Sequence, residues 1–138
     1  MGHWGVKSYE NDDAADALDA GFDQVHGAAY EAMMDDRSPL SFDEVQQRLA
    51  NPETLAAALD ALGESVGLPF DDWDETARLA FAGVVVRHAE FGVPLPDDWR
   101  TRAIEWLEGE EVEWQEATLR RLRRDKEVAL LRSKATAP

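Results

Sequence analysis

Residues 79–92, LAFAGVVVRHAEFG, decide the fold class of this chain, because they suit either a strand or a helix. Three consecutive valines, preceded by a glycine, favour a strand. Apolar and aromatic side chains also recur at the three- and four-residue spacing of a helix face: Ala77, Phe81, Val84, His88 and Phe91. We predict a helix here, and a minor strand near 79–87 is the alternative.

The flanking sequence has the pattern of further helices separated by caps and prolines. Asn11 is placed to cap a first helix, and Ser41 with Glu44 forms a capping box for a second. Asn51 and Pro52 end that helix and begin a third, which Gly63 or Gly67 ends. Two later starts are expected to be capped by Asp72 with Glu75, and by Asp97 or Asp98.

These signals predict an all-α fold, a compact single-domain bundle of five or six helices that spans residues 1–138. The expected helices are 12–34, 42–50, 52–63, 73–91, 98–108 and 111–132, and residues 133–138 are expected to form a frayed tail. A chain of 138 residues buries roughly 68% of its unfolded surface on folding, so it needs no disulfide.

Composition excludes several classes of protein. The chain has no cysteine, which excludes a thiol nucleophile and a cysteine-ligated zinc site. The opening residues lack the pattern of a secretory signal, and no apolar run approaches the roughly 20 residues of a membrane span. We therefore expect a cytoplasmic protein of bacterial type that does not enter a membrane.

The charge is unevenly distributed. Residues 1–75 hold 18 acidic and three basic side chains, which gives the whole net charge of −15. Residues 76–138 hold 11 of each sign, and seven of those bases lie within 120–134. Because most of such a surface repels phosphate, we expect no nucleic-acid partner.

Acidic side chains and one histidine share a face of the first predicted helix, which we call the acidic stripe: Asp12, Asp16, Asp19, Asp23 and His26. Three explanations remain open. The stripe is simply solvated, or it contacts basic side chains of the C-terminal helix or of a partner, or it binds a divalent metal through Asp16, Asp19, Asp23 and His26.

The C-terminal segment offers the opposite charge. Its arginine cluster, Arg120, Arg121, Arg123 and Arg124, is a candidate partner-binding surface. If geometry allows, the final helix lies back along the first two. Between chains, the same complementarity would give a homodimer, to which a weak heptad pattern and Trp114 would add apolar contact.

Other site candidates are few. Trp106 and Trp114 are candidate contact residues, because tryptophan is favoured in binding hot spots. His88 is expected to be a hydrogen-bonded core residue. No catalytic or nucleotide-binding motif is present, so we assign no catalytic residue and no cofactor, and leave open whether the protein is an enzyme.

The opening resembles a known family. Trp4-Gly5 followed by Tyr9-Glu10-Asn11-Asp12-Asp13-Ala14-Ala15-Asp16 resembles the start of a bacterial family described as domain of unknown function 4259. The similarity covers about the first 25 residues, and Lys7 stands where the family commonly has glycine. The resemblance implies a way of starting the fold and no activity.

We therefore carry two function hypotheses. The first is a non-catalytic acidic interaction protein, such as an inhibitor, an immunity-type protein or an adaptor, that covers a basic site on a protein partner. The alternative is a small divalent-metal-binding protein, or a metal-dependent enzyme, that uses the acidic stripe.

Overall fold

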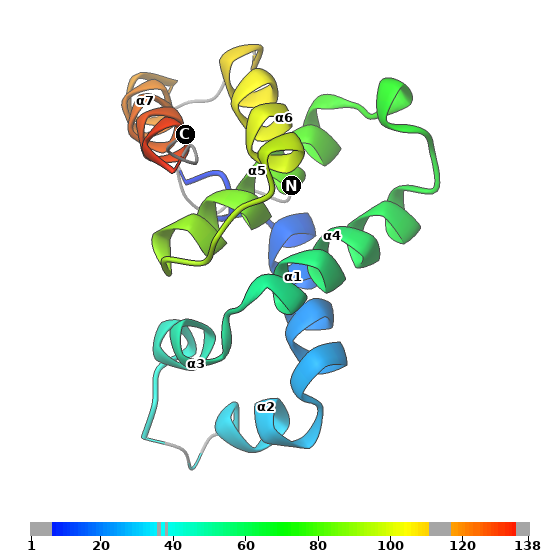
Figure 1. Ribbon diagram of the computed structural model, residues 1–138, viewed down its shortest axis with the longest axis vertical. Coiled ribbons are helices and arrows are strands. Elements are labelled where there is room, and N and C mark those ends of the chain that lie inside the picture. The colour runs from blue at the N-terminus through cyan, green and yellow to red at the C-terminus, as the bar shows by residue number, and fades with distance from the viewer. Residues whose placement is uncertain (1–6, 36, 38, 111–116, 135–138) are drawn as a thin grey trace.

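The computed structural model of the chain is a bundle of helices (Figure 1). It describes residues 7–35, 37, 39–110 and 117–134. The elements are α1 (Asp12–His26), α2 (Ala28–Met33), α3 (Phe42–Leu49), α4 (Pro52–Val66), the 3-10 turn η1 (Phe70–Asp72), α5 (Glu75–Glu90), α6 (Asp97–Glu108) and α7 (Ala117–Ser133). No strand occurs in the described ranges, so the all-α prediction is confirmed.

Helix α5 is buried around its whole circumference. Residues 79–89 are buried without interruption, which covers every face of a helix with 3.6 residues per turn. The helix packs against α1, α4, α6 and α7. A helix surrounded in this way needs no polar face, so the valine run reflects burial on all sides. The predicted helix 73–91 is confirmed as α5, which runs over Glu75–Glu90, and the alternative strand near 79–87 is wrong.

Two glycines allow other backbone segments to approach the helices closely. A Cβ atom on Gly83 would lie 2.4 Å from the carbonyl oxygen of Ser8, and one on Gly21 would lie 2.6 Å from the backbone nitrogen of Ala58. The segment that precedes α1 therefore crosses α5 at Gly83. In the same way α4 crosses α1 at Gly21.

Three of the predicted helix starts are confirmed. The Asn11 side chain accepts a hydrogen bond from the Ala14 amide, and the Ser41 hydroxyl accepts one from the Glu44 amide. Asn51 accepts from the Thr54 amide while the Thr54 hydroxyl accepts from the Asn51 amide, which completes a capping box. Of the two glycines proposed to end α4, Gly67 does so.

Two predicted caps are wrong. Asp74, not Asp72, caps α5, because its side chain accepts the Ala77 amide after the chain has turned through η1. The buried Trp73 donates from Nε1 to the Leu68 carbonyl at 2.8 Å, and this hydrogen bond closes the turn that precedes α5. Helix α6 has Pro96 at its N-cap and no side-chain cap, so neither Asp97 nor Asp98 has the predicted role.

The first predicted helix, 12–34, is two helices. Gly27 lies between them with φ 52° and ψ −120°, a conformation that suits glycine. The apolar spacing continues across this break through Val25, Ala29 and Met33, so the periodicity did not reveal it.

The sequence predicted that the final helix lies back along the first two, and this prediction is wrong. Helix α7 packs against α5 and α6. Figure 1 shows α7 beside α6 on one side of the bundle, and α4 with the loop that follows it on the other. Of the predicted helix 111–132, residues 111–116 lie outside the described residues, as does most of the predicted tail.

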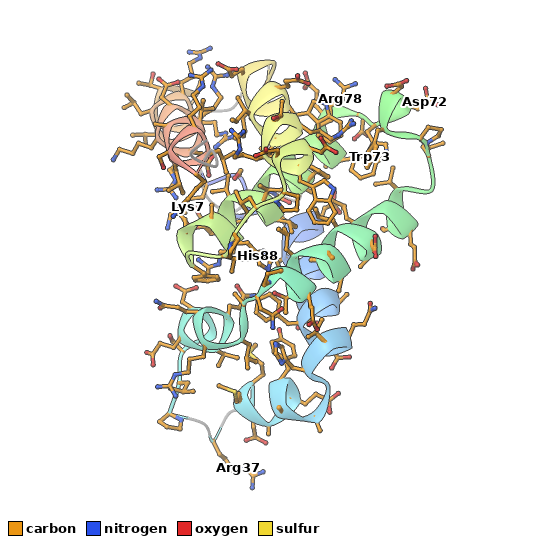
Figure 2. All side chains as sticks on the ribbon, viewed as in Figure 1. Lys7, Arg37, Asp72, Trp73, Arg78 and His88 are labelled. Carbon is orange, nitrogen blue, oxygen red and sulfur yellow. The ribbon has the colours of Figure 1, made fainter. Side chains whose placement is uncertain are left out.

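His88 is the hydrogen-bonded core residue that the sequence predicted. Its Nδ1 donates to the Val84 carbonyl at 2.9 Å, and its Nε2 accepts from the Thr54 hydroxyl at 2.9 Å. Figure 2 shows it in the interior where α5 meets α4. Burial, with a contribution from the charge of Arg87, lowers the pKa of His88 to about 4.

We expect Gly83→Ala to lower the free energy of unfolding by about 1–3 kcal/mol, because the added methyl group would overlap the backbone of Ser8. Gly63→Ala is the matched control, since nothing lies within 4 Å of its Cβ position and alanine is the better helix former. Urea denaturation of both variants measures the difference. Equal effects would contradict the close crossing.

The pKa of His88 predicts a loss of stability in acid. Between pH 6.5 and 4 the unfolded chain binds a proton at His88 that the folded chain does not, so unfolding is favoured by about 3 kcal/mol as the pH falls across this window. We expect this share of the pH dependence to be missing in His88→Gln. Urea denaturation of both proteins at pH 7 and pH 4 tests it, and parallel profiles would contradict it.

Candidate functional site

A groove lies between α1, α4 and the turn that precedes α5. It consists of two adjoining hollows of about 200 Å³ and about 300 Å³, which share Asp13, Leu62 and Ser65. Its lining is mixed: apolar surface comes from Ala17, Ala20, Ala61, Leu62, Val66 and Ala77, and polar side chains, among them Ser65 and Thr76, stand beside them. We call this feature the acidic groove, because of the side chains at its edges.

Carboxylates come to the groove from two segments far apart in the sequence. Helix α1 supplies Asp13 and Asp16, and the turn before α5 supplies Asp72 and Asp74. All four residues are exposed. Among the described residues, no lysine or arginine lines either hollow. The groove therefore combines apolar and hydroxyl-bearing side chains, and all the charge that its described lining carries is negative.

The turn before α5 also adds an apolar side chain to the groove. Leu68 lines the second hollow and is 54% exposed. The contact of the Trp73 indole with the Leu68 carbonyl fixes this turn. Figure 2 shows Asp72 on the outer part of the turn, beyond Trp73.

The acidic stripe is divided between two surroundings. Its aspartates are exposed, and Asp16 belongs to the acidic groove. Asp19 accepts a hydrogen bond from the Tyr30 hydroxyl at 2.6 Å, and His26 donates from Nε2 to the Leu49 carbonyl at 2.8 Å. Burial and then the bond to Asp19 raise the pKa of Tyr30. The C-terminal end of the stripe therefore helps to fix α2 and α3.

The metal hypothesis drew on Asp16, Asp19, Asp23 and His26. No group of three or more histidine, aspartate or glutamate side chains is placed to hold a metal ion within the described part of the chain. Two of the four candidate ligands already make the contacts with Tyr30 and Leu49 described above.

The four arginines of the C-terminal cluster do not form one surface. Arg120 is fully buried, Arg123 and Arg124 are partly buried, and Arg121 is exposed. Arg120 donates to Glu110 at 2.8 Å and to Glu127 at 2.9 Å, and both carboxylates are buried too. Burial alone would lower the pKa of Arg120, but these two partners outweigh it and raise the pKa above its ordinary value.

The same buried cluster attaches the segment before α1 to α7. The amide and hydroxyl of Ser8 donate to Glu127 at 2.9 and 2.8 Å. Nearby, Glu90 of α5 accepts from both the Tyr9 hydroxyl and Arg123. Arginines that were expected to contact the acidic stripe thus contact glutamates of the second half of the chain.

Two further bases of α7 also have partners close by. Arg124 donates to the Glu110 carbonyl at 3.0 Å, and Arg132 pairs with Glu108 at 2.6 Å. Both acceptors lie at or just after the end of α6, so these contacts hold α7 against α6.

Trp106 belongs to an aromatic cluster. Its ring centre lies 5.0 Å from that of Phe81, 5.6 Å from that of Trp73 and 6.0 Å from that of Phe70. The adjoining pocket has about 70 Å³, well below the roughly 300 Å³ of a small-molecule site. Trp106 therefore packs against the core, and Trp114 lies outside the described residues.

Sequence reasoning missed three of the four carboxylates of the groove. Asp13 and Asp74 lie at helix starts, where capping and the helix dipole explain an aspartate without any partner, and Asp72 was assigned to a cap that Asp74 forms. The repeated acids of DDWDE, at 71–75, were the available signal. Their proximity to α1 follows only from the packing of α4.

Comparison of the chain with protein-family models, with curated proteins and with solved structures finds no match. None of the described helices is both long enough and apolar enough to cross a membrane.

We expect Glu127→Leu to lower the free energy of unfolding by about 3–5 kcal/mol. The substitution leaves the buried Arg120 without one of its carboxylate partners and removes the acceptor of the Ser8 amide. Arg132→Met, which breaks an exposed pair, should cost at most about 1 kcal/mol. Urea denaturation gives both values. If the two costs were equal, the buried cluster would not be what attaches α7.

Proposed function

We propose that the protein is a non-catalytic interaction protein that binds a basic segment of a protein partner in the acidic groove. The observation that carries this proposal is the groove itself, a partly apolar hollow bordered by Asp13, Asp16, Asp72 and Asp74 with no lysine or arginine among its described lining residues.

The distribution of ion pairs supports an external partner. Arg120, Arg123 and Arg132 of α7 pair with glutamates of α5, α7 and the end of α6. These bases are therefore engaged away from α1, and the negative charge at the groove remains for a partner to neutralise. Complementary charge of this kind increases the rate of encounter and selects among partners more than it adds affinity.

The apolar part of the lining indicates the shape of the partner. An amphipathic helix that places apolar side chains on Leu62, Val66 and Leu68 would bring flanking lysines or arginines toward the aspartates. Because the same carboxylates would repel phosphates, this proposal excludes nucleic acid as the partner.

The test is the binding of a basic amphipathic helical peptide, followed by fluorescence anisotropy. Wild type should bind it, and Asp13→Lys combined with Asp16→Lys should weaken binding roughly tenfold or more, because like charges would then meet in the groove.

The matched control combines Glu31→Lys with Glu53→Lys, which makes the same charge change on α2 and at the start of α4, outside the groove. Equal weakening in both double variants would mean that the peptide responds to net charge only, and the groove would not be the site. Circular dichroism confirms that both variants remain folded.

A further inference from the structure

Helix α7 has an exposed apolar face on the side away from the bundle. Its buried residues are Arg120, Glu127, Val128 and Leu131. Leu119 and Leu122, three residues apart, are 54% and 58% exposed. Lys126 and Ala129 continue the same face and are exposed as well. We call these four residues the α7 outer face.

The α7 outer face has the chemistry that the acidic groove is proposed to accept. Two leucines at helical spacing are followed one turn later by Lys126, and Lys134 lies near the end of the same helix. The face is therefore a short exposed helix face with two leucines and one lysine.

The groove and the α7 outer face cannot meet within one chain. Helix α7 is held against α5 and α6 by packing and by the buried pair of Arg120 and Glu127. Figure 1 shows α7 on one side of the bundle and the C-terminal end of α4, which borders the groove, on the other. Any contact between these two surfaces must join two copies.

We propose that the α7 outer face of one copy docks in the acidic groove of a second copy. This inference rests on the function proposed above and names one partner for it. Leu119 and Leu122 would cover the apolar side chains of the groove, and Lys126 would approach Asp13 and Asp16. The arrangement is head to tail, so each copy keeps one unused groove and one unused helix face, and association proceeds to open chains. The net charge of −15 on each copy opposes long assemblies.

The alternative self-association, α7 against α7, is less well matched. It would join two faces that each carry a lysine, Lys126, and no carboxylate, whereas the groove offers four carboxylates. Head-to-tail and symmetric contacts can be told apart by mixing two variants, one altered in the groove and one altered in the α7 outer face. Only a head-to-tail contact is restored in this mixture.

Sedimentation velocity over a concentration series tests the proposal with the full chain. Wild type should form dimers and longer species as its concentration rises. The groove variant, Asp13→Lys with Asp16→Lys, and the helix variant, Leu122→Glu with Lys126→Glu, should each weaken self-association roughly tenfold or more. A helix control, Gln47→Glu with Arg48→Glu, makes the same charge change on exposed residues of α3 and should associate like wild type.

Mixing the groove variant with the helix variant is the decisive step. One intact groove and one intact α7 outer face then remain between the two copies, so the mixture should form a dimer and nothing longer. Failure of the mixture to form this dimer, or association that the helix variant leaves unchanged, would overturn the proposal.

The peptide experiment separates this inference from the function on which it rests. If wild type stays monomeric while the basic peptide still binds in the groove, self-docking is wrong and the proposed function stands. If the peptide does not bind and wild type stays monomeric, both proposals fall. If wild type associates and the groove variant behaves like wild type, the groove is not the contact surface.

Discussion

The fold depends on the burial of α5 by other parts of the chain on every side. A helix with apolar side chains around its whole circumference is stable only where neighbours cover all of it, and α1, α4, α6 and α7 do so here. The segment before α1 covers a further part, because Gly83 lets the backbone of Ser8 pass in direct contact. Packing around one helix therefore fixes the positions of elements that are distant in the sequence.

Charged groups within this packing decide where α7 lies. Arg120 and Glu127 are buried together, and Glu127 also accepts both hydrogen bonds from Ser8. Buried charges without partners would cost several kcal/mol each, so α7 must dock where Arg120, Glu110 and Ser8 converge. As a consequence, many bases of the second half of the chain are paired with glutamates near α5 and α6, whereas the acids of the first half remain at the surface.

The acidic groove results from both effects. The close crossing of α1 and α4 at Gly21 brings Asp13 and Asp16 beside the turn that carries Asp72 and Asp74, although nearly 60 residues separate the two pairs. Because α7 is held elsewhere, no arginine of that helix reaches these carboxylates. The protein thus has an acidic groove on one side and, on the other, a helix face that carries two leucines and a lysine, and both proposals start from the groove while the second also uses this face.

The sequence by itself determined the local features. Asn11, Ser41 and Asn51 mark helix starts because a side-chain cap acts on amides only two or three residues away. Residues 79–90 are helical, as their apolar spacing predicts. Tertiary structure alone decided which of several adjacent aspartates caps α5, that Gly27 divides the first helix, and that Arg120 pairs with Glu110 and Glu127 inside the protein. Tertiary structure alone also decided where the groove forms and where α7 lies. The sequence shows which segments are charged and which helix faces are apolar. Which charges meet depends on the distances between segments, and only the packing around α5 sets these distances.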